Sequence, residues 1–141
     1  MGRPLYETEA DLSREAGVMQ TAAEAWKCDY LKLPLSYRLD YALLRDERLV
    51  ALAEIRVRFV SVMQYPTIIF SVMKRATANM LSDQLYVPSL FVVQYDDALR
   101  YIDFTETPDD VTVGGRTGQA RRDHADVELV GHYRTDRLKR L

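Results

Sequence analysis

The sequence predicts an α/β fold in which helices flank a mixed β-sheet. Two amphipathic helical patterns alternate with short apolar strands, and the second helical pattern separates a hairpin from a buried strand, as a crossover connection does. The chain has 141 residues, 48% of them apolar, and a net charge of −2. This composition indicates a folded protein with one substantial core. We therefore expect residues 1–141 to form a single domain.

The first helix is expected over residues 8–26. Thr8 can cap its N-terminus, and Glu9 and Asp11 suit the positive end of the helix dipole. Apolar side chains recur at three- and four-residue steps and form one stripe, with Glu15 at its edge. The stripe consists of Leu12, Ala16, Met19, Ala22, Ala23 and Trp26.

A short strand over residues 28–33 is ended by Pro34, and a hairpin follows with strands over 37–45 and 49–59. The turn of this hairpin, Asp46-Glu47, lacks the glycine that two-residue primed turns prefer. A longer loop is therefore an alternative, and the choice affects which residues of the two strands lie opposite each other.

A second helix is expected over residues 67–85, although its start, Thr67–Phe70, is rich in β-prone residues. Its predicted core stripe consists of Ile69, Val72, Met73, Ala76, Met80 and Leu81. The remaining elements are strands over 89–95, 99–104 and 127–133, with a loop-like stretch over 105–126. The aromatic residues of the last strands, at 91, 95, 101 and 104, are expected in the core.

Each strand of the hairpin carries one acid among apolar neighbours, Asp40 in the first and Glu54 in the second. Lone carboxylates are unfavourable in buried strands. The two acids lie about equally far from the turn, but a regular two-residue loop would set Asp40 opposite Ala53. A three-residue loop or a bulge would bring the two acids face to face. Two facing carboxylates repel unless a cation lies between them, and a divalent metal is the obvious candidate.

This arrangement resembles the PD-(D/E)xK nuclease superfamily, and in particular its small phage-type and resolvase-like members. The resemblance rests on a helix with Glu15, a strand with Asp40, Glu54-Ile55-Arg56 on the paired strand, a crossover helix and a buried strand. It covers residues 12–104 and implies a restriction-endonuclease-like core. It also implies that Asp40 and Glu54 bind Mg²⁺ or Mn²⁺ and that Glu15 is an accessory acid of the site.

The third position of the motif is normally lysine, and here it is Arg56. Arginine stays protonated, so it cannot act as a base, although it can hold a phosphate or stabilise charge. Lys74, on the second helix, could supply the missing ammonium, as in members that carry their lysine on a neighbouring element. The resemblance thus assigns five residues to the catalytic site: Asp40, Glu54, Arg56, Lys74 and Glu15.

The resemblance implies metal-dependent hydrolysis of phosphodiester bonds in DNA. Carboxylate-held Mg²⁺ suits this reaction because it activates a water molecule and neutralises phosphate charge. One alternative is a catalytically impaired relative that binds nucleic acid or another protein, which Arg56 favours. A small accessory phage protein without a role in nucleic-acid chemistry is another. Many enzymes of this kind dimerise to cut both strands, so a homodimer is an expected assembly.

Structural explanations exist for the same residues. Asp40 and Arg56 could form a cross-strand salt bridge, Glu15 could be a solvated helix residue, and Lys74 could be a surface charge. The chain from Thr112 onwards has a net charge of +3 and the preceding part −5. This basic end, with a glycine- and arginine-rich loop over 114–122, is compatible with a polyanionic partner or with a solvated linker.

Composition also bears on location. The sequence has no apolar run long enough to span a bilayer, and residues 1–7 lack the apolar core of a signal peptide. A single cysteine, Cys28, excludes an internal disulfide. We therefore expect a cytoplasmic protein without a membrane partner, located in the host cytoplasm if a phage encodes it.

Overall fold

The computed structural model describes residues 8–115 and 127–141. The expectations for residues 1–7 and for most of the glycine- and arginine-rich loop, residues 116–122, lie outside the described residues.

Both predicted helices form. Helix α1 (Glu9–Trp26) begins at a capping box, in which the Thr8 hydroxyl accepts a hydrogen bond from the Asp11 N–H at 3.0 Å. Helix α2 (Val72–Leu85) ends at Tyr86, whose left-handed backbone closes the last turn. In the part of the chain that the structure describes, neither helix is long and apolar enough to cross a bilayer.

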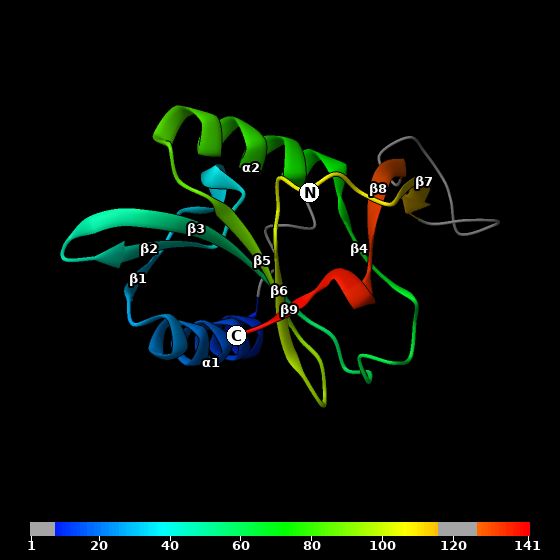
Figure 1. Ribbon diagram of the computed structural model, residues 1–141, viewed down its shortest axis with the longest axis horizontal. Coiled ribbons are helices and arrows are strands. Elements are labelled where there is room, and N and C mark those ends of the chain that lie inside the picture. Colours follow the sequence, from blue (N-terminus) through cyan, green and yellow to red (C-terminus); the bar gives the residue numbers. More distant parts are fainter. Residues whose placement is uncertain (1–7, 116–126) are drawn as a thin grey trace.

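A six-stranded mixed sheet forms the centre of the molecule, and α1 and α2 cover its opposite faces (Figure 1). Its strand order is β1-β2-β3-β5-β6-β9. The β3–β5 pair is parallel and the other pairs are antiparallel, as expected for a crossover through α2. The strands are β1 (Asp29–Lys32), β2 (Tyr41–Arg45), β3 (Arg48–Val57), β5 (Ser89–Gln94), β6 (Leu99–Asp103) and β9 (Lys139–Arg140).

A separate three-stranded antiparallel sheet was not predicted. It consists of β4 (Thr67–Ser71), β8 (Val127–Arg134) and β7 (Asp110–Gly115), in the order β4-β8-β7. The predicted helical start at residue 67 is therefore wrong, because the β-branched residues of this segment pair with β8. The loop-like prediction is likewise wrong for the residues of β7, which pair with the other side of β8.

The β2–β3 hairpin turns in two residues rather than through a longer loop. Asp46 (φ 53°) and Glu47 (φ 66°) both adopt the left-handed conformation, as a primed turn requires, although neither is glycine.

A register shift in this hairpin restores the pairing of the acids. Leu44 lies opposite Leu49, but Leu43 lies opposite Ala51, so Val50 is an extra residue on β3. The shifted pairing continues to Tyr41 and Ala53, which places Asp40 beside Glu54 at the next position. Asp40 itself immediately precedes β2, because the chain before it forms a short 3₁₀ helix, η2 (Leu35–Tyr37), rather than the strand expected from residue 37.

The core has one cluster on each face of the six-stranded sheet. On the α1 face, the predicted stripe supplies Met19, Ala22 and Ala23, which are buried. On the α2 face, the predicted stripe is wrong, since Met73 and Met80 are more than half exposed. The helix begins at residue 72 and turns Ala78 inwards, and the space is filled instead by the rings of Phe70, Phe91, Phe104 and Tyr133, which pack in stacked and edge-on pairs. The expected burial of the aromatic residues at 91, 95 and 104 is confirmed.

Candidate active site

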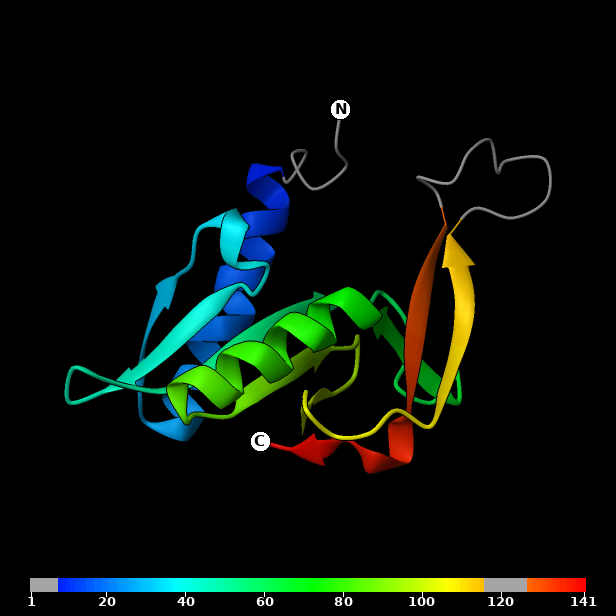
Figure 2. The same cartoon turned by 90° about the horizontal axis from the view of Figure 1, so that it is seen from above.

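A cleft of about 1080 Å³ is lined by residues of α1, η2, β3, β4, α2 and β8. Helix α1 and η2 lie on one side of the molecule and the β4–β8 pair on the other (Figure 2). The carboxyl-terminal half of β3 and the first turn of α2 line its floor. The described side chains around it include acids, bases and several apolar groups. All five site residues predicted from the sequence line this cleft: Glu15, Asp40, Glu54, Arg56 and Lys74.

Asp40 is fixed to β3 by its backbone and by its side chain. Its N–H donates to the Ala53 carbonyl at 3.0 Å, and its Oδ2 accepts from the Ile55 N–H at 2.7 Å. The remaining oxygen, Oδ1, lies 3.5 Å from the Lys32 Nζ. That distance is long for a charge-assisted hydrogen bond, so Oδ1 is the less committed of the two oxygens.

Glu54 is almost completely buried on the α2 face of β3, with 3% of its surface exposed. Its Oε2 accepts a hydrogen bond from the Lys74 Nζ at 2.6 Å. Its Oε1 is buried and has no hydrogen-bond partner among the described residues. Burial, reinforced by the negative charge of Asp40, raises the pKa of Glu54 to about 8 in spite of the nearby Lys74 ammonium.

Lys74 enters the cleft from the first turn of α2. Burial by itself would lower the pKa of Lys74, but the contact with the Glu54 carboxylate outweighs this effect and raises it. The side chain keeps 40% of its surface exposed, so the ammonium is available to a molecule in the cleft. The alternative in which Lys74 is only a surface charge does not agree with this contact.

The expected alternative of an Asp40–Arg56 salt bridge is wrong, because the ion-pair partner of Asp40 is Lys32. Among the described residues, Arg56 forms no ion pair, and its side chain lies half-buried in the cleft. Glu15 is half-buried on α1 and faces the same cleft. Arg56 and Glu15 therefore line the same cleft as the Asp40–Glu54 pair.

The donor set fits a hard divalent cation. Within residues 8–115 and 127–141, no three His, Cys, Asp or Glu side chains gather closely enough to hold a metal ion. Mg²⁺, however, keeps several waters and binds through one or two carboxylates. The unpartnered Oε1 of Glu54 and the loosely held Oδ1 of Asp40 provide two such oxygens in one cleft.

Sequence reasoning missed Lys32. In the β1–β2 register Lys32 lies opposite Tyr41, and its ammonium lies 5.3 Å from the centre of the Tyr41 ring. This lysine lies beside Asp40 because the chain makes the 3₁₀ helix η2 before β2, and the Leu33 N–H donates to the Asp40 carbonyl at 2.8 Å. The signal was therefore the pairing of two strands rather than a motif.

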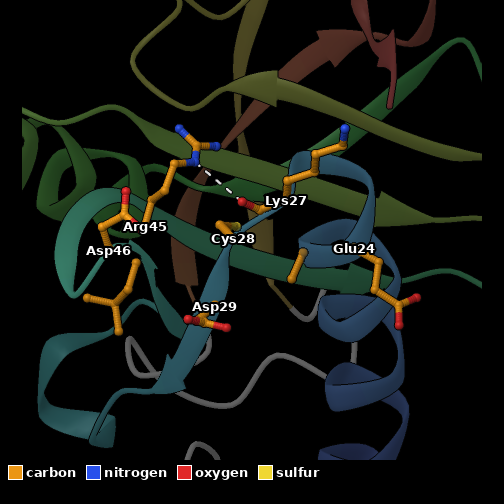
Figure 3. Close-up of a pocket in the computed structure, with 8 residues that line it drawn as sticks. Glu24, Lys27, Cys28, Asp29, Arg45 and Asp46 are labelled. Carbon is orange, nitrogen blue, oxygen red and sulfur yellow. Dashed lines mark hydrogen bonds between the residues drawn. The ribbon is translucent and has the colours of Figure 1, made fainter.

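A second, smaller pocket of about 270 Å³ shares no residue with the cleft (Figure 3). It lies where α1 ends, and Arg45 is one of the charged residues that line it. The guanidinium donates to the carbonyls of Trp26 at 2.8 Å and Lys27 at 3.3 Å. Since a cation at a helix C-terminus satisfies the last carbonyls and the dipole, this pocket has a structural explanation.

Comparison with known proteins agrees with this geometry. The family model described as "Phage putative PDDEXK endonuclease" matches residues 1–141. The chain belongs to this family. The membership predicted from Glu15, Asp40 and the Glu54-Ile55-Arg56 segment is thus confirmed, including its phage-type character.

A solved structure supports the PDDEXK fold independently. The 1.6 Å structure of Hjc, a Holliday junction resolvase from the archaeal hyperthermophile Archaeoglobus fulgidus, superposes with a TM-score of 0.52 at 8% sequence identity. The match covers 67% of this chain and 81% of that chain. At this identity the similarity concerns the fold alone, and it confirms the predicted restriction-endonuclease-like core. No curated protein sequence matches the chain.

Proposed function

We propose that this PDDEXK protein is an endonuclease that hydrolyses phosphodiester bonds in DNA with a divalent metal ion, and that the reaction takes place in the cleft around Asp40 and Glu54. The observation that carries the proposal is the buried Glu54 beside Asp40, with one carboxylate oxygen that no described group satisfies. A buried, unsatisfied carboxylate is costly unless a cation completes its environment.

The residues have separate roles in this proposal. Mg²⁺ or Mn²⁺ held by Asp40 and Glu54 would activate water and neutralise phosphate charge. The Ile55 N–H holds the Asp40 carboxylate in orientation, and Glu15 completes the acidic side of the cleft. Hydrolysis adds water across one P–O bond, so the leaving sugar oxygen must gain a proton and the phosphate remains anionic.

We assign the role of the usual motif lysine to Lys74. Its ammonium contacts Glu54 directly and remains accessible from the cleft. It is therefore placed to donate a hydrogen bond to a phosphate oxygen while holding the carboxylate. Arg56, two residues after Glu54 on β3, would bind a phosphate oxygen without exchanging protons.

The direct test incubates the purified protein with plasmid, linear and branched DNA in Mg²⁺, Mn²⁺ or EDTA. We expect cleavage with either metal and none in EDTA. Asp40→Asn should lower the rate by about 100-fold or more, because several kcal/mol of charge stabilisation are lost. Asp46→Asn, in the turn of the same hairpin and outside the cleft, is the matched control. Cleavage that persists in EDTA or in Asp40→Asn contradicts the proposed site.

The role of Lys74 is tested by removing this lysine and then introducing a lysine at position 56. Lys74→Met should lower cleavage about 100-fold, and adding Arg56→Lys to that variant should restore part of the rate by returning an ammonium to the usual motif position. Lys139→Met, on the exposed strand β9, is the control. Unchanged cleavage by Lys74→Met would remove Lys74 from the site.

Arg56 favours a second candidate, a catalytically impaired member that binds nucleic acid or another protein. Mn²⁺ titration separates the two, because an impaired protein without a metal site gives no heat of binding, whereas the proposed enzyme gives binding that Asp40→Asn abolishes. The homodimer, the single-domain organisation and the cytoplasmic location stay predictions. Light scattering of the purified chain tests the first of these.

A further inference from the structure

The catalytic cleft exposes apolar side chains that phosphodiester chemistry does not need. Four of its lining residues are large, apolar and substantially exposed. They are Phe59 (68%), Met73 (59%), Leu35 (54%) and Ile69 (37%). A site that recognised only phosphates would be lined by N–H donors and cations, so these side chains indicate an apolar component of the substrate.

In DNA the extensive apolar surfaces are the faces of the bases. In an intact duplex these faces are covered by stacking, and the duplex presents phosphates, sugars and polar base edges to a protein. Base faces become available only where nucleotides are unpaired and unstacked, and proteins bind them there with aromatic and arginine side chains.

Phe59 and Arg14 form such a surface. The Arg14 guanidinium lies 5.4 Å from the centre of the Phe59 ring, and its NH2 donates to the Asp11 Oδ1 at 2.6 Å. Asp11 and Phe59 thus hold the guanidinium from two elements, α1 and the segment after β3. The ring of Phe59 is nevertheless two-thirds exposed, so it is not a core residue.

This surface lies close to the acids. Arg14 is the immediate neighbour of Glu15 on α1, and Phe59 follows Glu54 by five residues, which is at most about 17 Å of extended chain. Both line the same cleft as Lys74 and Arg56, whose charges suit the phosphates of a bound strand. The cleft therefore combines the anionic, cationic and apolar groups that a short piece of single strand would contact.

We propose that the cleft binds DNA that has an unpaired nucleotide beside the scissile phosphate, and that Phe59 and Arg14 stack on the base of this nucleotide. The position relative to the cut rests on the proposed nuclease function; the stacking itself does not. The substrate class is single-stranded, flapped or branched DNA in preference to intact duplex.

The test measures binding without cleavage, by fluorescence anisotropy of a labelled single strand and of the matching duplex in EDTA. The wild-type chain should bind the single strand more tightly than the duplex. Phe59→Ala should weaken single-strand binding about 5- to 100-fold and leave duplex binding unchanged within about twofold. Phe59→Tyr, which keeps the stacking face, should bind like the wild type.

Tyr65→Ala is the matched control, since Tyr65 is a half-exposed aromatic residue of the same connecting segment and does not line the cleft. A single strand carrying 2-aminopurine gives a second readout, because stacking on Phe59 changes its fluorescence and Phe59→Ala should abolish that change. Equal losses on single strand and duplex, or no loss at all, would overturn the proposal.

The two proposals fail separately. If the protein cleaves intact duplex efficiently and Phe59→Ala changes nothing, the stacking surface is wrong and the nuclease function stands. If the protein cleaves no DNA but binds single strands through Phe59, the nuclease function is wrong and the stacking surface stands.

Discussion

The two sheets of this protein are built differently. The six-stranded sheet is covered on both faces, and five successive residues of β3, from Ala51 to Ile55, are buried. The three-stranded sheet is covered on one face near β4, while its strands β7 and β8 expose Val111, Val113 and Leu129 by half or more. The paired acids belong to the first sheet. The second sheet supplies a wall of the cleft and continues directly from β4 into α2, which carries Lys74.

This difference indicates where each sheet gets its stability. The six-stranded sheet buries many residues on two faces, so the loss of one contact removes only a small part of its stabilisation. The three-stranded sheet packs on the rest of the molecule through Phe70 and Tyr133, whose rings contact the Phe91 ring of β5, and Phe70 also contacts the Phe104 ring. Substitutions at these attachment points should therefore act on the whole second sheet and, through β4, on the start of α2.

The largest expected effect is that of Phe70→Ala. Phe70 is 1% exposed and contacts three other rings, so its removal leaves a cavity that should lower the free energy of unfolding by about 3–5 kcal/mol. Urea denaturation measures this loss. Ile69→Ala, on the same strand but 37% exposed, should cost much less. Equal losses at both positions would contradict the idea that Phe70 anchors the sheet.

A matched pair of glycine substitutions compares the two regions. A Cβ atom on Gly131, in β8, would lie 2.4 Å from the Phe70 ring, whereas a Cβ atom on Gly17, in α1, meets nothing within 4 Å. Gly131→Ala should therefore lower the free energy of unfolding by about 1–3 kcal/mol. Gly17→Ala should raise it by about 0.5–1 kcal/mol, because alanine favours the helix. Thermal melts of the two variants under the same conditions check both signs.

Tyr133 makes the second sheet sensitive to alkali. Its hydroxyl donates to the Glu106 carbonyl at 2.8 Å, and burial raises the pKa of Tyr133 to about 12 from an ordinary value near 10. A raised pKa in the folded state contributes stability below about pH 10 that is lost as the pH approaches 12. Tyr133→Phe should cost about 1 kcal/mol at pH 7.

The stability difference between Tyr133→Phe and the wild type should then shrink between about pH 10 and pH 12. Urea denaturation at a series of pH values measures it. A difference that stays constant over this range would show that the hydroxyl ionises equally well in the folded and unfolded chain.

The smallest effect belongs to the six-stranded sheet. Glu47 adopts φ 66° in the hairpin turn, a conformation that costs a glutamate more than a glycine. Relief of this backbone strain in Glu47→Gly should raise the free energy of unfolding by about 0.5–1 kcal/mol. The larger conformational entropy of glycine in the unfolded chain acts in the opposite direction and reduces this gain. A decrease in a thermal melt would mean that this entropy dominates.

Local patterns were sufficient for much of the fold. The stripe and cap of α1, the hairpin and the buried strand β5 each have a signal within a few residues. The acids were also recognised locally, as two carboxylates at matched distances from a turn, and their pairing requires the bulge at Val50 that was one of the expected alternatives. The three-stranded sheet has no such signal, because β4 and β8 are about sixty residues apart in the sequence and are joined only by long-range packing.

The site shows the same limit. Lys74 was suggested by the lack of a lysine at residue 56, but its contact with Glu54 depends on where α2 begins, and the predicted helix began five residues too early. Lys32 required the β1–β2 register, and Phe59 the knowledge that β3 ends at Val57. These features follow from how elements meet, which a single segment does not encode.

The extra residue of the hairpin has a consequence for chain length. Shortening β3 by removing Val50 would regularise the ladder and leave Asp40 beside Glu54. Inserting one residue between Ala53 and Glu54 would instead turn Glu54 to the α1 side of the sheet, away from Lys74, without altering any functional group. Spacing thus constrains this hairpin as strictly as residue identity does, and the bulge allows β3 to lose one residue without separating the two acids.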